Sequence, residues 1–300
     1  MTDSSAPAVA VLLATYNGES WLQQQIDTIH AQEGVRVHIV ASDDSSTDTT
    51  PEILLRYAAN SPLLCLPQAS ARMGNANRNF LRLVFEAPLG DVHFVAFSDQ
   101  DDIWHAAKLA RAIAELARTG AHAYSSNVKA FWPDGRTRVL VKSQPQRRHD
   151  HLFESAGPGC TFVFTREAFE RLQSWVRSDY ARLCESPVHD WLIYAFARVQ
   201  GWRWHIDDAA LMDYRQHGLN EVGANVGSNA ALRRLGLLQD GRFRRNAIQV
   251  ASLVDDASWV SRSLRRLTLM DRLRLALAFR SLRRRWRDAL MMIYFLLTTK

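Results

Sequence analysis

The sequence is poor in cysteine and has no apolar run long enough to cross a bilayer as a helix. Its three cysteines, Cys65, Cys160 and Cys184, are too few and too scattered for a disulfide framework or a four-ligand zinc site. The longest late apolar run, Ala289–Leu297, is nine residues long, whereas a spanning helix needs about 20. The opening segment Met1–Pro7 is polar and resembles no secretory signal. These absences predict a protein that folds and stays in the reducing cytoplasm.

Two common nucleotide-binding motifs are also missing. No Gly-x-Gly-x-x-Gly follows the first apolar run, which argues against a dinucleotide oxidoreductase. No Gly-x-x-x-x-Gly-Lys-Ser/Thr occurs anywhere, which excludes P-loop chemistry.

The composition is that of an ordinary globular protein, but its positive charge is concentrated at one end. The 300 residues are 47% hydrophobic and 23% charged, with a net charge of +6, so the chain can bury a sizeable core. Residues Arg262–Lys300 contain eleven Lys/Arg and two Asp/Glu, a net charge of +9. The rest of the chain therefore carries −3, and the basicity belongs to the C-terminal tail.

The first hundred residues alternate between strand and helix patterns. Apolar runs predict strands at Ala8–Ala14, Val35–Ala41, Leu63–Leu66 and Val92–Phe97. Helical spacing between and after them predicts helices at Trp21–Gln32, Asn77–Glu86 and Ala106–Arg118. A further helix is expected to run to Asn60 from the N-cap residue Thr50 and from Pro51 at its first position. In the first helix, Trp21 is expected on the apolar stripe. This alternation predicts an α/β fold with a mostly parallel sheet flanked by helices. Ligands of such sheets bind at the carboxyl ends of the strands, where this sequence places its polar clusters.

The first polar cluster joins Thr15-Tyr16-Asn17-Gly18 to Asp43 and Asp44. A pyrimidine nucleotide needs a stacking surface and an acceptor for its ring N–H, which Tyr16 and a carboxylate can supply. The alternative is structural: Asn17-Gly18 forms a tight turn and the two aspartates cap the next loop.

The second polar cluster is Ser98-Asp99-Gln100-Asp101-Asp102-Ile103-Trp104. Three carboxylates within four residues repel one another unless a cation lies among them. Hard oxygen ligands suit Mg²⁺ or Mn²⁺, which also bind substrate phosphates. The alternative is a solvated acidic turn.

Two later segments carry further candidates. In Pro187–Trp191, Asp190 can act as a general base beside the apolar wall of Trp191, or it can simply cap a helix. In the loop that follows Tyr214, Arg215 can bind phosphate oxygens and His217 can complete a metal shell, unless this histidine is structural.

Taken together, these segments resemble glycosyltransferase family 2. The resemblance covers about Val9 to Gly223 and rests on five motifs in order: Val11–Gly18, Ser42–Asp48, Ser98–Trp104, His189–Trp191 and Tyr214–Gly223. The Ser-Asp-Gln-Asp-Asp-Ile-Trp and Tyr-Arg-Gln-His-Gly segments are closest to its bacterial rhamnosyltransferase-like branch. One departure is Asp43-Asp44-Ser45-Ser46, where the family usually has Asp-Asp-Gly-Ser.

The resemblance implies a GT-A fold, a nucleotide-sugar donor, Mn²⁺ or Mg²⁺, and inversion at the anomeric carbon. It assigns Tyr16, Asp43 and Asp44 to the nucleoside, and Asp99 and Asp101 to the Asp-x-Asp pair, with Asp101 as direct metal ligand. Asp190 becomes the catalytic base. We expect the nucleotide-sugar site to comprise Thr15, Tyr16, Asn17, Asp43, Asp44, Asn79, Asp99, Gln100, Trp104 and Arg215, the metal site Asp101, Asp99 and His217, and the acceptor side His189 and Trp191.

The predicted function is an inverting glycosyltransferase that moves a sugar from a dTDP- or UDP-sugar to a hydroxyl of a glycan or lipid-linked acceptor, as in cell-surface polysaccharide synthesis. Rhamnose is the candidate sugar. A metal-dependent sugar nucleotidyltransferase and a non-catalytic membrane-bound scaffold are the alternatives. We expect a catalytic domain over residues 1–225 and a helical, basic, amphipathic region over 226–300. That region predicts contact with the inner face of the cell membrane, or with a second subunit. Nucleic acid is not expected, because no nucleic-acid-binding motif accompanies the charge.

Overall fold

The computed structural model describes the backbone of residues 6–69, 71–217 and 241–298, with side chains as far as residue 294. The chain forms two compact units, each built from several segments. The sheet unit comprises Met1–Ser143, Gly157–Glu185 and Trp202–Glu221, and the helical unit comprises Gln144–Ala156, Ser186–Gly201 and Val222–Lys300. The expected linear boundary at residue 225 lies outside the described residues. Besides the C-terminal residues, the helical unit includes two earlier segments of the chain, Gln144–Ala156 and Ser186–Gly201.

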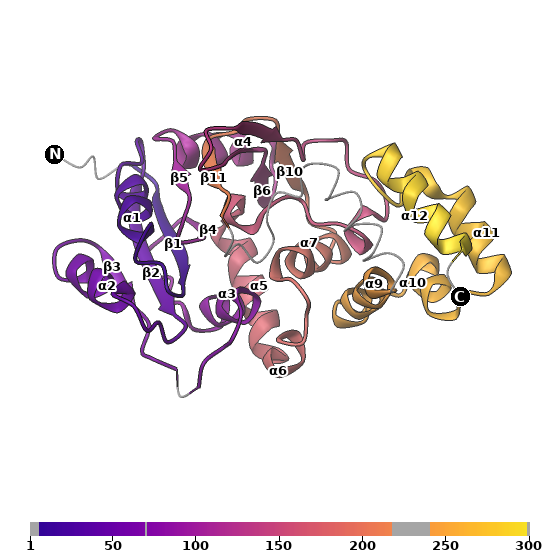
Figure 1. Ribbon diagram of the computed structural model, residues 1–300, viewed down its shortest axis with the longest axis horizontal. Helices are drawn as coiled ribbons and strands as arrows, with labels where there is room; N and C mark the ends of the chain where they lie inside the picture. The colour runs from indigo at the N-terminus through magenta and orange to yellow at the C-terminus, as the bar shows by residue number, and fades with distance from the viewer. Residues whose placement is uncertain (1–5, 70, 218–240, 299–300) are drawn as a thin grey trace. The chain divides into compact units, whose positions relative to one another are not determined.

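The sheet unit is organised around a seven-stranded sheet (Figure 1). Its strands are β1 (Ala8–Thr15), β2 (Arg36–Asp43), β3 (Leu63–Cys65), β4 (Phe94–Ser98), β6 (Ala123–Ser126), β9 (Val163–Thr165) and β10 (Trp204–Asp207), in the order β10-β6-β9-β4-β1-β2-β3. β1 runs parallel to β2 and β4, β2 parallel to β3, and β6 parallel to β10. β9 is antiparallel to both of its neighbours. The prediction of a mostly parallel α/β sheet is therefore confirmed.

The described residues of this unit include the α-helices α1 (Leu22–His30), α2 (Thr50–Ala58), α3 (Ala76–Glu86), α4 (Lys108–Thr119), α5 (Arg166–Ser178) and α6 (Tyr180–Leu183). Local signals explain their ends. The Asn75 side chain caps α3 by accepting from the backbone N–H of Arg78, and Gly120 ends α4 in the left-handed conformation that glycine favours. In α2, Thr50 does not cap its own helix. Its buried hydroxyl accepts the backbone N–H of Gly18 instead, at 2.8 Å.

A second, four-stranded sheet contains β5 (Ile103–Trp104), β11 (Met212–Arg215), β7 (Val128–Phe131) and β8 (Thr137–Leu140), in that order. β7 and β8 form an antiparallel hairpin. β5 follows the acidic cluster directly and pairs antiparallel with β11. This pairing brings the residues after β11 next to that cluster, although more than a hundred residues separate them in the sequence.

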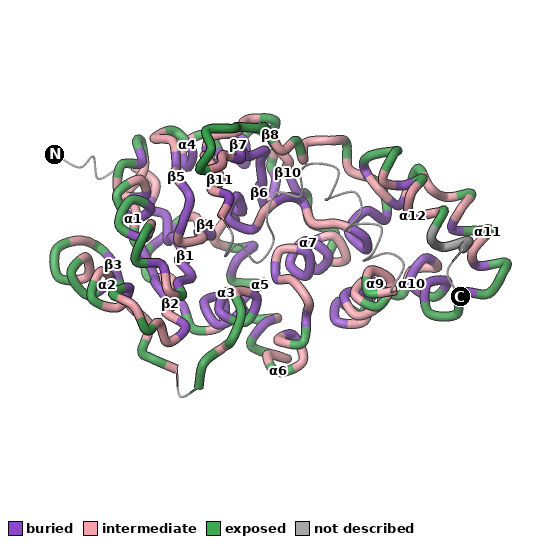
Figure 2. Tube along the Cα trace, in the orientation of Figure 1, coloured by how far each residue is buried: buried purple, intermediate pink, exposed green. Residues whose placement is uncertain are grey.

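The core of the sheet unit lies around β1, which is buried along its whole length (Figure 2). An aromatic group of Phe97, Phe162, Phe164 and Phe169 packs beside β4 with ring centroids 5.4–6.4 Å apart. Replacing one such buried phenylalanine by alanine typically lowers the free energy of unfolding by about 3–5 kcal/mol.

One buried carboxylate helps to hold β6, β10 and α4 together. Asp207 accepts two hydrogen bonds from Arg111, at 2.9 and 3.1 Å, and one from the Tyr124 hydroxyl at 2.9 Å. Burial by itself raises the pKa of Asp207, but these donors stabilise the carboxylate more strongly and lower its pKa to about 2.

The helical unit contains η1 (Asp150–Leu152), α7 (His189–Val199), α9 (Arg242–Leu253), α10 (Trp259–Arg266), α11 (Leu269–Leu277), η3 (Phe279–Ser281) and α12 (Trp286–Thr298). Helix α7 packs against η1 and α9, and α11 packs against both α10 and α12. A capping box starts α11, with Thr268 and Asp271 bonding to each other's backbone N–H groups. No helix within the described residues is long and apolar enough to span a membrane.

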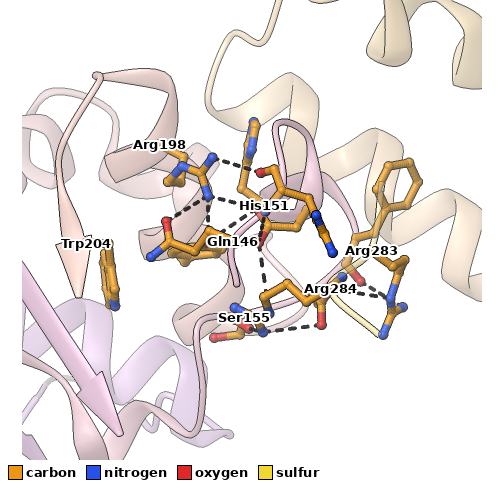
Figure 3. A network of polar contacts seen from close by, with 12 residues as sticks. Gln146, His151, Ser155, Arg198, Trp204, Arg283 and Arg284 are labelled. Atoms are coloured by element: carbon orange, nitrogen blue, oxygen red, sulfur yellow. Dashed lines mark hydrogen bonds and ion pairs between the residues drawn. The ribbon is translucent and has the colours of Figure 1, made fainter. Parts of the chain in front are cut away.

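A buried ionic network holds the helical unit together (Figure 3). The fully buried carboxylate of Asp150 accepts a hydrogen bond from Arg198 at 2.8 Å and a bifurcated one from the Tyr194 hydroxyl, which lies 3.2 Å from both carboxylate oxygens. The guanidinium of Arg284 is also fully buried and donates to Glu154 at 3.2 Å. Two basic residues of the C-terminal tail, Arg283 and Arg284, are therefore committed to internal ion pairs.

Candidate functional site

The carboxyl ends of β1, β2 and β4 meet at one edge of the sheet. The parallel register pairs Thr15 with Asp43 and Leu13 with Ser98. The loops that follow these strands hold both of the polar clusters predicted from the sequence. The sequence pattern had indicated this edge, and the register confirms it.

Asp43 organises the loop after β2. Its carboxylate accepts hydrogen bonds from the Thr15 hydroxyl at 2.9 Å and from the Ser46 backbone N–H at 2.8 Å. Asn17, in the left-handed conformation with φ of 45°, accepts from the Thr47 backbone N–H at 2.9 Å. These bonds fasten the loop after β1 to the loop after β2.

Asp44 anchors a third loop to the same edge. This buried carboxylate accepts the backbone N–H groups of Met73 and Gly74 and lies 3.8 Å from the Arg72 guanidinium. Arg72 in turn lies over the Tyr16 ring, 4.0 Å from its centroid. Tyr16 is 36% exposed as a whole residue, so this aromatic and cationic pair is accessible to a planar, anionic ligand.

Gln100 links the acidic cluster to the loop after β1. Its side-chain oxygen accepts the backbone N–H of Tyr16, and its side-chain nitrogen donates to the Tyr16 carbonyl, both at 2.8 Å. A Cβ atom at Gly18 would lie only 2.3 Å from the Gln100 Oε1 atom. Glycine at position 18 therefore leaves room for this two-bond clamp.

Asn79 supports the strand ends from α3. Its amide oxygen accepts the Ser42 hydroxyl at 2.6 Å, and its amide nitrogen donates to the carbonyls of Ser42 at 2.9 Å and Thr15 at 3.3 Å. The side chain is 2% exposed. We had expected Asn79 to touch the donor. In the structure, its side chain holds the backbone at the ends of β1 and β2.

The residues after β11 contact the acidic cluster as the strand pairing implies. His217 Nε2 lies 2.6 Å from Asp101 Oδ2, and the His217 ring stacks on Trp21 with centroids 4.1 Å apart. Arg215 donates from Nε to the Asp101 carbonyl at 2.8 Å and from Nη2 to the Gln24 side chain at 2.7 Å. Arg215 therefore fixes the acidic loop directly.

Behind this loop lies a buried polar group that the motif analysis did not identify. It consists of Asp102, Lys108 and Cys160, with Trp104 beside it. Burial raises the pKa of Asp102, and the carboxylates of Asp101 and Asp99 raise it further. Burial lowers the pKa of Lys108 to about 8, and its ammonium lies 3.5 Å from the Trp104 ring centroid.

Trp104, like Asn79, is a buried residue beside the predicted site. It is only 3% exposed, and one face of its ring is covered by Lys108. A tryptophan in the family's motif had indicated a donor contact. Here the ring packs in the core behind the acidic loop.

The sequence predicts a divalent cation at Asp99, Asp101 and His217, and the structure brings the side chains of Asp101 and His217 into contact. Carboxylate oxygens suit Mn²⁺ and Mg²⁺, and an imidazole adds one nitrogen ligand. Asp99 instead groups with Asp102 and Cys160: within the described residues, one ligand atom from each of these three lies within 4.8 Å of the other two. Burial raises the pKa of the Cys160 thiol, which keeps it protonated and makes it a poor ligand.

The predicted base and acceptor-side residues belong to the helical unit. Asp190 lies in the first turn of α7 and is partly buried. His189 is buried, which lowers its pKa to about 3 and keeps it neutral. Trp191 is buried as well, and its indole N–H donates to the His151 carbonyl at 2.8 Å.

Several residues of this edge were not singled out from the sequence. Trp21, expected on the buried stripe of its helix, precedes α1 and stacks on His217. Gln24 and Arg72 each contact a predicted residue from a separate loop or helix. Gln24 lies on α1 and its partner Arg215 follows 191 positions later, so no local pattern signals this contact.

Comparisons with known proteins show which family the chain resembles. Residues 10–173 match the model of the glycosyl transferase family 2. The chain is 37% identical over 287 residues to the dTDP-rhamnosyl transferase RfbG of Shigella flexneri, covering 95% of this chain and 99% of that one. It is 27% identical to the succinoglycan biosynthesis protein ExoO of Rhizobium meliloti, covering 80% of this chain and 73% of the relative.

Solved structures show the same fold at low sequence identity. TarS 1–349 from S. aureus in complex with UDP-GlcNAc matches with a TM-score of 0.58 at 16% identity, covering 86% of this chain and 69% of that one. The mannosyltransferase PcManGT from Pyrobaculum calidifontis, in complex with GDP-Man and Mn²⁺, matches with a TM-score of 0.52 at 19% identity, covering 98% of this chain and 86% of that one. The fold is thus of the GT-A type. This chain belongs to glycosyl transferase family 2.

Proposed function

We propose that this glycosyltransferase transfers rhamnose from dTDP-rhamnose to a hydroxyl of a glycan or lipid-linked acceptor in cell-surface polysaccharide synthesis. The observation that carries the proposal is the 37% identity to a dTDP-rhamnosyl transferase over 95% of the chain and 99% of the relative. The similarity extends over nearly the full length of both proteins. Membership of the family also favours sugar transfer over the nucleotidyl transfer that the acidic motifs alone left open.

The edge of the sheet supplies the groups that a nucleotide sugar requires. Tyr16 offers a stacking face to the thymine ring, and Arg72 beside it offers a positive charge to the diphosphate. The bonds from Asp43 to Thr15 and from Asp44 to the backbone of Gly74 hold the surrounding loops before the donor arrives. Such preorganisation lowers the entropy that binding must offset.

Asp99, Asp101 and His217 would hold the divalent cation, as Mn²⁺ or Mg²⁺. When bound, the cation offsets the negative charge that develops on the departing dTDP. Arg215 keeps the Asp101 backbone in position, and the Trp21 ring fixes the plane of the His217 imidazole. These two contacts set the directions of the ligand atoms before a cation binds.

We assign Asp190 as the general base. Its carboxylate aligns the acceptor hydroxyl and removes its proton while the hydroxyl oxygen attacks the anomeric carbon and the bond to dTDP breaks. One displacement from the face opposite the leaving group inverts the configuration. His189, which precedes Asp190 in the sequence, is neutral and therefore does not form an ion pair with the Asp190 carboxylate. We also propose that the protein acts at the inner face of the cell membrane, where it would reach lipid-linked acceptors.

A donor screen tests the proposal. Purified full-length protein with Mn²⁺ is incubated separately with dTDP-rhamnose, dTDP-glucose, UDP-glucose and GDP-mannose, and the released nucleotide is quantified. We expect release of dTDP from dTDP-rhamnose to be the fastest reaction, and chelation of Mn²⁺ to suppress it. Faster release of UDP or GDP would refute the choice of donor, and release of pyrophosphate would indicate nucleotidyl transfer.

A further inference from the structure

The C-terminal helices of the helical unit have two apolar faces. Side chains facing inward are fully or nearly buried: Leu264, Leu275, Leu282, Ala289 and Met292. A second set points outward on α11 and α12: Leu269, Met270, Leu273, Leu277, Trp286, Leu290 and Tyr294, each between 45% and 86% exposed. The sequence had indicated one basic amphipathic region. The structure divides its apolar residues into a core set and an additional exposed set.

The exposed set follows helical spacing on both helices. On α11, Leu269, Leu273 and Leu277 are four residues apart, and on α12, Trp286, Leu290 and Tyr294 repeat the same interval. Residues at that interval lie on one side of a helix. The two helices pack against each other and are drawn together in yellow in Figure 1. Single exposed apolar residues are ordinary, but two ordered stripes on packed helices indicate a contact surface.

The same segment exposes cations and almost no anions. Its exposed arginines are Arg262, Arg265, Arg266, Arg274, Arg280, Arg285 and Arg287. The acidic residues between Trp259 and Tyr294 are both engaged. Asp271 is buried in the α11 cap and bonded to Arg266, and Asp288 lies partly buried 3.8 Å from Arg283.

We propose that α11 and α12 form a docking surface for an anionic lipid bilayer, with their exposed apolar stripes inserted at headgroup level. This charge pattern decides between a membrane and a second copy of the chain. A two-fold contact between copies sets the same patch against itself, which would bring arginines together with no exposed carboxylate to neutralise them. Anionic headgroups supply the missing charge, and the apolar residues enter the acyl boundary. Exposed Trp286 with Arg287 over its ring is typical of such interfaces.

The test measures binding of full-length protein to vesicles by sedimentation, with no nucleotide sugar present. It therefore does not depend on the proposed transferase activity. Vesicles contain phosphatidylcholine alone or phosphatidylcholine mixed with phosphatidylglycerol. The apolar variant carries L269Q, L273Q and L277Q, and the charge variant carries R285Q and R287Q. A matched control carries L55Q, L64Q and V139Q, three exposed apolar residues of the sheet unit.

We expect wild type and the matched control to bind the anionic vesicles equally, and added salt to weaken that binding. The charge variant should bind at least ~10-fold more weakly, because two cations near an anionic surface are lost. The apolar variant should also bind at least ~10-fold more weakly, because three leucines no longer enter the acyl boundary. Equal thermal unfolding of all variants shows that they fold.

The proposal is overturned if the wild-type protein does not bind anionic vesicles, or if the apolar variant binds them as well as the matched control does. It is also overturned if, without lipid, analytical ultracentrifugation shows a dimer that the apolar variant converts to monomer while vesicle binding is unchanged. In that case the surface joins two copies of the chain.

Discussion

The clamp between Gln100 and Tyr16 yields a quantitative prediction for Gly18→Ala. Gly18 does not have a positive φ, so alanine fits the backbone conformation. The added methyl group would occupy the position of the Gln100 Oε1 atom. Because Gln100 is a flexible side chain, it would swing away rather than force the backbone to move, and both of its bonds to Tyr16 would break.

The cost follows from those two bonds. Each partly exposed hydrogen bond contributes on the order of 0.5–1 kcal/mol, so the loss is about 1–2 kcal/mol. If the loop that carries Tyr16 must be ordered to bind the donor, the affinity for dTDP falls about 5- to 30-fold. Gln100→Ala removes the same two bonds without any clash and should have a similar effect.

A double-mutant cycle separates the clamp from any other role of Gly18. We would measure the dTDP affinity by calorimetry, and stability by urea unfolding, for Gly18→Ala, Gln100→Ala and the double variant. Once Gln100 is alanine, Gly18→Ala has nothing left to displace, so the double variant should match Gln100→Ala within about 0.5 kcal/mol. Additive losses would refute the reasoning, since the two residues would then act independently.

Three further perturbations probe the metal site and two buried ion pairs. Asp101→Ala should abolish sugar transfer and remove the Mn²⁺ dependence of donor binding, measured by calorimetry with and without Mn²⁺; near-normal turnover would exclude Asp101 as a ligand. The folded-state pKa of Asp207 is about 2, below its ordinary 3.8, so its contribution of about 2 kcal/mol is present above pH ~4 and lost as the pH falls towards 2. The gap in urea stability between wild type and Asp207→Asn should shrink over that range, and a constant gap would contradict the pKa assignment. Arg284→Ala removes the buried guanidinium that pairs with Glu154 and should lower the free energy of unfolding in urea by about 3–5 kcal/mol. The control Arg285→Ala, at an exposed neighbouring position, should lower it by less than ~0.5 kcal/mol. Equal losses in the two variants would show that the buried pair contributes nothing.

The sequence predicted those parts of the fold that depend on local pattern. Apolar runs followed by polar clusters located the strand ends, and parallel pairing then had to bring the clusters to one edge. Ser45 illustrates how far a motif can depart from its family. It stands where the family has glycine and adopts a φ of 59°, so the loop keeps a backbone conformation that glycine favours despite the substitution.

What the sequence could not predict depends on tertiary packing. The sequence of a motif does not show whether its tryptophan or asparagine contacts a ligand or supports a loop. In the structure both Trp104 and Asn79 are buried: Lys108 covers the Trp104 ring, and the Asn79 amide bonds to the Ser42 carbonyl. The Thr50 hydroxyl was expected to cap its helix but bonds to Gly18, because a distant loop supplies a donor. In the tail, helical periodicity alone could not tell the inward Leu275 from the outward Leu277.

The most direct test of the proposed function is the stereochemistry of transfer by wild type and Asp190→Asn, followed by NMR with dTDP-rhamnose, Mn²⁺ and a hydroxyl acceptor. For wild type we predict dTDP and a rhamnoside whose anomeric configuration is opposite to that of the donor. For Asp190→Asn we predict donor affinity close to wild type and kcat lower by at least ~10²-fold, the scale of general-base catalysis. A product with retained configuration, or unchanged turnover in Asp190→Asn, would contradict the assignment of Asp190 as the base of an inverting displacement.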